Sequence, residues 1–291
     1  MLFLQYCLSG ILTGGIYGLI GVSIVIIYKS TKIFNFAVGT MMTLGGLICV
    51  SLLLRFNISF YIALPVTLLL SALVGALVER GFLRPLLAQP ILTLIMATLA
   101  IDSILYGVML MLWTSHAIGF PEGILPGKTV FLGPLFISHE FLYAFFMAVV
   151  SFALIGLFFY KTLTGLRMRV AAESHVVAMA LGINITRVFS FTWMLSAMVV
   201  AVAGIFIGNR IGLQVALTSS LAMRALPAVI LGGLDSLVGA IIGGFVVGVI
   251  EKLVGGYIGV KFSEITPYVI LLIVLIIRPE GLFGQKRIER I

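Results

Sequence analysis

Long apolar segments follow one another along this chain with short polar connections between them, and this feature restricts the fold more than any other. They lie near residues 4–27, 34–54, 60–78, 90–113, 140–160, 187–208, 213–231, 236–256 and 265–277. About 20 apolar residues are enough for a helix to cross a hydrocarbon core of roughly 30 Å. A helix also satisfies its backbone hydrogen bonds internally, as a bilayer requires. The sequence therefore predicts an all-α, polytopic transmembrane helical bundle.

The seventh apolar segment is the weakest, because Arg224 and Pro227 interrupt it. Proline removes a backbone donor from a helix, and irregular backbone is tolerated at membrane depth where protein covers it. We therefore expect about 8–10 membrane segments, with a broken or re-entrant segment at this position. Only 10% of the residues are charged, so residues 1–291 are predicted to form a single transmembrane domain.

The basic residues indicate how the chain is oriented in the membrane. If the N-terminus is outside and the chain crosses nine times, twelve of the 18 lysines and arginines lie inside, four lie outside and two lie within spans. Positive charge favours the cytoplasmic side. We therefore expect a cytoplasmic C-terminus, a cytoplasmic loop at about 161–187 and an external loop at about 114–139. Topology accounts for the net charge of +8, so no nucleic acid partner is expected.

Two predicted spans carry clusters of glycine. They read "GILTGGIYGLIG" at residues 10–21 and "LGGLDSLVGAIIGGFVVG" at residues 231–248. In a bilayer, small residues allow helix backbones to approach closely and to pack by van der Waals contact. These stretches therefore predict packing seams, either between helices of this chain or with a partner subunit.

A short, half-polar stretch, "GLRMRVAAESHVVAMALGIN" at residues 165–184, separates two apolar segments. It predicts one cytoplasmic helix over residues 168–181, with Gly182 as the residue that ends it. Asn184 or Thr186 is then available to cap the next span. Such a helix can lie in the headgroup layer. Alternatively, it docks onto a partner, with small residues allowing close approach (Ala171, Ala172, Ala178, Ala180) and Arg169 and Glu173 setting its orientation.

Three polar side chains fall within or at the start of predicted spans. Asp102 lies mid-span, where ionisable groups usually face a cavity or a partner. It is a proton relay, a polar point on a substrate path or, as we favour, a hydrogen-bonding partner of a neighbouring helix. Arg224, beside the interrupted backbone, binds a substrate carboxylate or pairs with Glu251 or Asp235. Asn35 begins the second span, where a helix cap is the simplest explanation.

The sequence offers no catalytic or metal chemistry of its own. The "PGKT" at residues 126–129 resembles the end of a phosphate-binding loop, but the first glycine of that pattern is replaced by Glu122. The three histidines have no ligand spacing, so no metal site and no cofactor are expected. If ATP drives this protein, another chain binds and hydrolyses it.

Five motifs in the chain are similar to those of the permease subunits of branched-chain amino acid ABC importers, in particular the shorter, LivH-type subunit. They are "GGIYGLI…IIY…FNFAVG" (14–39), "ERGFLRPL…PILTLIMATLAI" (79–101), "RVAAESHVVAMALGIN" (169–184), "RALPAVILGGLDSLVGAIIGGFVVGVIE" (224–251) and "RPEGLFG" (278–284). The resemblance runs almost end to end. The chain departs from the family pattern where Val38 and Thr40 replace a histidine and an acidic residue, and where Asp235 replaces a glycine.

The resemblance implies a bacterial inner-membrane protein that forms part of the path for branched-chain or other hydrophobic amino acids. The partners it implies are a second permease, identical or related, two cytoplasmic ATP-binding subunits and an external substrate-binding protein. It also implies that the cytoplasmic helix is the coupling helix to the ATPase, formed by Arg169, Ala171, Ala172, Glu173, Ala178, Leu181 and Gly182.

Other functions remain open on sequence grounds. Urea and short-chain amide importers use similar permeases, and the motifs do not separate their substrates from amino acids. A secondary transporter that uses Asp102 as a proton site would need its own coupling residues and no coupling helix. A membrane scaffold would need no broken, polar span. Copurification of partner proteins in mild detergent would separate these classes.

Overall fold

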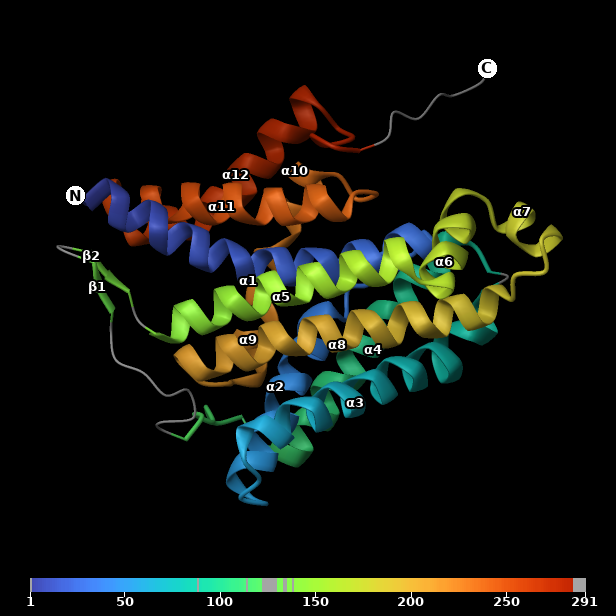
Figure 1. The fold of residues 1–291 in the computed structure, drawn as a ribbon, viewed down its shortest axis with the longest axis horizontal. Helices are drawn as coiled ribbons and strands as arrows, with labels where there is room; N and C mark the ends of the chain where they lie inside the picture. Colours follow the sequence, from blue (N-terminus) through green and yellow to red (C-terminus); the bar gives the residue numbers. More distant parts are fainter. Residues whose placement is uncertain are drawn as a thin grey trace.

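The computed structural model describes residues 2–87, 89–113, 115–121, 130–132, 135–137 and 139–284. Long helices run side by side through most of its length (Figure 1). Eight helical segments in the described residues are long and apolar enough to cross a membrane, and a ninth apolar helix is shorter. The predicted all-α, polytopic transmembrane bundle is therefore confirmed.

The long helices correspond closely to the predicted spans. They are α1 (Leu2–Thr31), α3 (Phe60–Val78), α4 (Ile91–Trp113), α5 (His139–Lys161), α8 (Ile185–Ile211), α11 (Leu237–Tyr257) and α12 (Val260–Ile277). The shorter apolar helix is α2 (Val38–Leu54). Helix α3 continues through a π-helical turn, η1 (Glu79–Leu83), and a 3-10 turn, η2 (Arg84–Leu86).

Helices α1 and α8 form the centre of the bundle. The apolar stretch of α1 is 94% buried and that of α8 is 78% buried, whereas the values for α4 and α12 are 17% and 11%. Since a bilayer is as apolar as these exposed side chains, the outer helices are suited to contact lipid or another membrane subunit. Helix α1 lies between α5 and α11 (Figure 1).

The two glycine clusters pack against each other within this chain. A Cβ added to Gly14 would lie 2.7 Å from the Cα of Phe245 and 2.8 Å from the carbonyl oxygen of Gly244. A Cβ on Gly244 would meet the backbone of Gly18 in the same way, at 2.6 Å. The predicted seam is therefore the contact between α1 and α11, where the backbones come too close for side chains.

The seventh apolar segment is broken, as predicted. It consists of α9 (Val215–Met223) and α10 (Leu226–Gly232), separated by Arg224 and Ala225. Pro227 lies at the start of α10, where a missing backbone N–H costs little. The two pieces together, Val215–Gly232, still have the length and hydropathy of a membrane span.

Two further segments lie outside the long helices. Strands β1 (Val130–Leu132) and β2 (Leu135–Ile137) form a small antiparallel hairpin within the loop predicted to be external. After α12 the chain turns back, and the N–H groups of Leu282 and Phe283 donate to the carbonyls of Leu231 and Gly232 at the end of α10 (2.7 and 3.1 Å). The residues 126–129 that resemble a phosphate loop lie outside the described part of the chain.

Candidate coupling and translocation sites

The half-polar stretch folds into two helices, so the predicted single helix over 168–181 is wrong. Helix α6 covers Leu163–Glu173 and α7 covers His175–Ala180. Between them Ser174 is extended (φ −157°, ψ 119°), and its Oγ accepts a hydrogen bond from the N–H of Val177. Serine side chains compete with helical backbone bonds in this way, which explains the break.

The predicted end of this stretch is confirmed. Gly182 has a φ of +74°, its N–H donates to the carbonyl of Met179, and the N–H of Ile183 donates to that of Ala178. This pair of bonds is the Schellman arrangement, which favours glycine because of the positive φ. Asn184 then caps α8 by accepting from the N–H of Arg187 (3.1 Å).

The residues predicted to contact an ATPase do not share one exposed face. Ala171 and Ala178 are fully buried within this chain, and the guanidinium of Arg169 lies over the Tyr160 ring, 5.3 Å from its centroid. Ala172 is half-buried, while Glu173 and Gly182 are exposed.

The outward surface of α7 and of the residue after it is instead formed by larger apolar side chains, of which the sequence reasoning had named only Leu181. They are Val176, Val177, Met179 and Leu181, exposed by 52–72%. We call this set the α7 face.

Helix α7 is held against the ends of the two central helices. The Nε2 of His175 lies 3.1 Å from the carbonyl oxygen of Ser30 in the last turn of α1, and its ring packs on Phe189 of α8, with 5.5 Å between centroids. In Figure 1, α7 projects from the end of the bundle opposite to the β hairpin. A force applied to the α7 face would therefore reach α1 and α8 directly.

Asn35 acts locally in the turn before α2. It is buried, its Oδ1 accepts from the N–H of Ala37 (3.0 Å), and its Nδ2 approaches the sulfur of Met41 (3.5 Å). The N-cap residue of α2 is Ala37, so Asn35 forms an Asx turn two residues before the N-cap rather than the cap itself. Asn35 therefore orders the entry into α2.

Asp102 makes the inter-helix hydrogen bond that we favoured for it. The hydroxyl of Thr40 on α2 donates to its Oδ1 over 2.8 Å. Thr40 is one of the positions where the chain departs from the family pattern. The Asp102 side chain is thus held by a neighbouring helix within the bundle.

Arg224 pairs with Glu264 of α12, across 3.2 Å, and not with Asp235 or Glu251. Asp235 follows α10 and instead pairs with Lys32 (2.9 Å), whereas Glu251 accepts a hydrogen bond from the hydroxyl of Tyr17 (2.7 Å). The predicted partners were wrong because the turn between α9 and α10 directs the Arg224 side chain toward α12.

A buried polar network at the end of α3 was also missed. The carboxylate of Glu79, only 1% exposed, accepts from the guanidinium of Arg84 (3.1 and 2.9 Å) and from the Ser190 hydroxyl of α8 (2.6 Å). Two opposite charges five residues apart at the end of an apolar run are the sequence signal that points to this pair. The network fixes the end of α3 to α8.

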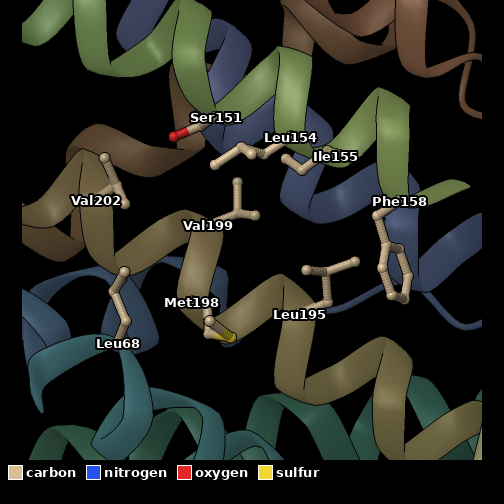
Figure 2. Close-up of a pocket in the computed structure, with 9 residues that line it drawn as sticks. All are labelled: Leu68, Ser151, Leu154, Ile155, Phe158, Leu195, Met198, Val199 and Val202. Carbon is tan, nitrogen blue, oxygen red and sulfur yellow. The ribbon is translucent and has the colours of Figure 1, made fainter. Parts of the chain in front are cut away.

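An apolar groove of about 280 Å³ lies between α3, α5 and α8 (Figure 2). Of the side chains that line it, only Ser151 is polar; the others include Leu68, Ile155 and Val199. A zwitterionic substrate carries two charges that this groove cannot compensate, because burying an unpaired charge is costly. The groove is therefore not a candidate for the substrate path.

Comparison with known proteins identifies relatives along almost the whole chain. A family model described as "Branched-chain amino acid transport system / permease component" matches residues 6–277. A probable branched-chain amino acid transport permease protein LivH of Methanocaldococcus jannaschii is 31% identical, covering 94% of this chain and 90% of that protein. The high-affinity branched-chain amino acid transport system permease proteins BraD of Pseudomonas aeruginosa and LivH of Escherichia coli K12 are 25% and 26% identical, each covering 99% of this chain and 98% of the relative.

Among solved structures, a chain of PsaBC from Streptococcus pneumoniae in complex with Fab aligns with 96% of this chain and 93% of its own length. The TM-score is 0.49 and the sequence identity is 17%.

Proposed function

Because this chain belongs to the family of branched-chain amino acid transport permeases, we propose that it is the permease subunit of an ABC importer. It forms part of the translocation path for branched-chain or other hydrophobic amino acids, and separate ATPase subunits power the transport. The observation that carries this proposal is the family match over residues 6–277, which includes nearly every described helix.

The proposed assembly contains this chain and a second, related or identical permease, two cytoplasmic ATPases and an external substrate-binding protein. The permease itself contributes no ATP chemistry and needs no cofactor. The bias of basic residues supports an inner-membrane orientation with the N-terminus outside and the C-terminus in the cytoplasm. In this orientation α6 and α7 face the ATPases.

We assign coupling to the α7 face rather than to the alanines of the same stretch. Val176, Val177, Met179 and Leu181 form an exposed apolar surface, which is typical of a contact with another protein. Their helix is attached to α1 and α8 through His175. Closure of an ATPase pair beneath the membrane would therefore move the central helices.

Transport by the reconstituted assembly tests this function. The permease is coexpressed with its ATPases and partner permease, placed in vesicles with the binding protein, and supplied with labelled leucine. We expect leucine uptake to require ATP on the side of the membrane where the ATPases lie. We also expect isoleucine and valine to reduce leucine uptake by competition. Competition by urea or acetamide alone would identify an amide importer instead.

Replacing Asp102 with Asn separates ATP-driven transport from proton coupling. Asparagine still accepts the hydrogen bond from Thr40 but cannot carry a proton on a carboxylate. We therefore expect leucine uptake within about twofold of the unmodified protein, since the hydrogen bond is retained. Loss of uptake, together with transport by the purified permease in response to a pH gradient, would identify a secondary transporter.

A further inference from the structure

A cavity of about 170 Å³ lies between α1, α8, α9 and α11, near the exposed end of α8. Its polar lining consists of Thr13 and Tyr17 of α1, Arg210 of α8, Arg224 between α9 and α10, and Glu251 and Lys252 of α11. We call it the charged cavity. The apolar groove between α3, α5 and α8, in contrast, has no charged side chain in its lining.

Most of the charged side chains around this cavity already have a partner within the protein. Glu251 is only 4% exposed, and its Oε2 is already held by the Tyr17 hydroxyl at 2.7 Å. Arg224 is further compensated from outside the cavity by Glu264, at 3.2 Å. Arg210 is not without a partner either, which leaves Lys252 as the charged side chain of the lining to be considered.

Lys252 is the cation with the weakest compensation. Within the described part of the chain, its ammonium group makes no hydrogen bond and no ion pair, although Glu251, Arg210 and Arg224 are close enough to act on it electrostatically. It lies on α11, whose apolar stretch has the length of a membrane span. Ionisable side chains within such segments are rare and are by default candidates for a functional site.

The remaining walls of the charged cavity are apolar. Ile16 of α1, Ile207 and Ile211 of α8 and Leu221 of α9 line it beside the charged groups. An inorganic anion would gain nothing from these side chains, whereas a carboxylate with a branched aliphatic tail would bury that tail against them. The lining is therefore complementary to an aliphatic carboxylate.

We propose that the charged cavity is a subsite for the transported amino acid, an inference that rests on the proposed function. Lys252, with Arg210 and Arg224, attracts the substrate carboxylate through charge-assisted hydrogen bonds. The second oxygen of Glu251, which Tyr17 leaves available, faces the substrate ammonium group. The apolar side chains of the lining contact the aliphatic side chain of the substrate. The subsite thus distinguishes a zwitterion from a neutral amide.

Ligand-dependent thermal stability of the detergent-purified permease–ATPase complex, without binding protein, tests the subsite directly. A ligand that binds only the folded state raises its unfolding temperature. The probes are isovalerate, a carboxylate with a leucine-like tail, and isovaleramide, its neutral counterpart. We expect isovalerate at millimolar concentration to raise the unfolding temperature and isovaleramide to leave it unchanged. Equal effects of the two probes would overturn the proposal even without any variant.

Lys252→Met is the informative variant, and Lys261→Met on α12 is its matched control, since Lys261 is exposed and does not line the cavity. Lys252→Met loses one charge-assisted hydrogen bond to isovalerate. The isovalerate concentration that gives the same rise in unfolding temperature should therefore increase by about tenfold or more. Lys252→Arg should restore the response, and Lys261→Met should behave as the unmodified complex. If Lys252→Met lowers the starting stability but keeps the full isovalerate response, the lysine has only a structural role and the proposal is wrong.

Leucine uptake by the unmodified assembly separates this inference from the proposed function. Uptake without a Lys252-dependent isovalerate response would overturn the subsite and leave the function standing. A Lys252-dependent response in an assembly that imports no hydrophobic amino acid would support the anion site and overturn the function.

Discussion

At the scale of single residues, three carboxylates of this bundle are held by specific partners. Asp102 accepts from Thr40, Glu79 is bonded to Arg84 and Ser190, and Glu251 is bonded to Tyr17. In a bilayer no water replaces a lost partner, so these bonds keep polar side chains from destabilising the spans.

Replacing Tyr17 with Phe tests how much one such bond contributes. The variant keeps the ring and removes the hydroxyl that donates to Glu251. We expect the free energy of unfolding to fall by about 1 kcal/mol, in the range found for hydrogen bonds between transmembrane helices. Unfolding in increasing concentrations of denaturing detergent measures the change. Tyr61→Phe serves as the control, because the Tyr61 side chain is 79% exposed, and an equal loss there would contradict the assignment.

Sequence reasoning identified Asp102 and Arg224 as polar residues within spans but missed the network of Glu79. The apolar pattern located Asp102 and Arg224 within spans, yet nothing in the spacing indicates that Arg224 reaches α12. Its partner, Glu264, is 40 positions away. The direction of the Arg224 side chain depends on the turn that breaks the span, and that geometry is set by packing rather than by local sequence.

At the scale of helices, most predictions that depend on local sequence were confirmed, whereas burial that depends on packing between helices was not predicted. Long apolar segments, the broken seventh span and the end at Gly182 follow from local chemistry, and the structure confirms them. The break at Ser174 was missed, because alanine-rich flanks favour a continuous helix while one serine hydroxyl interrupts it. The inward position of Ala178 depends on contacts with other helices, so the sequence could not reveal it.

The α7 face gives the sharpest test at this scale. Val176→Asp places a charge on a side chain that is 72% exposed, so the permease should still fold and insert. A charge buried in an apolar protein contact is costly, so we expect copurification of the ATPases and substrate-stimulated ATP hydrolysis to fall at least about tenfold. Phe56→Asp, at the other end of the bundle and 67% exposed, is the matched control.

If Val176→Asp retains its ATPases and normal stimulated hydrolysis, α7 lies in the headgroup layer and does not couple. Ala178→Trp is a poor substitute for this test. Ala178 is fully buried within the chain, so a large ring there would disrupt the permease itself.

The contact between α1 and α11 predicts a second effect at the scale of helices. Gly14→Leu would drive a side chain into the backbone of α11, so the cost should exceed the roughly 1–3 kcal/mol typical of overpacking. A Cβ added at Gly156 on α5 meets no atom within 4 Å, so Gly156→Leu should be tolerated. Folded yield after mild detergent extraction, measured by size-exclusion chromatography, compares the two. Similar yields would mean that the α1–α11 seam can open without loss.

At the scale of the whole molecule, the orientation in the membrane decides which end meets the ATPases. In a Cys-free version, with Cys7→Ser and Cys49→Ala, single cysteines are introduced at Ser115 and Glu173, which are both exposed. We expect an impermeant thiol reagent to label the Ser115 position in intact cells and the Glu173 position only after lysis. The reverse pattern would invert the topology and place α7 outside.

The hydrogen bond between Tyr17 and Glu251 also implies a minimum delay between the synthesis of α1 and its packing against α11. The two residues are 234 positions apart, and at about 5–20 residues per second a ribosome needs roughly 12–47 s to make the chain between them. Helix α1 is thus synthesised before the other described α-helices, yet its glycine surface packs against α11, which follows nine of them in the chain order. Helices α5 and α8, which also pack on α1, emerge in between. The early bundle must therefore keep one side of α1 open until α11 arrives to fill it.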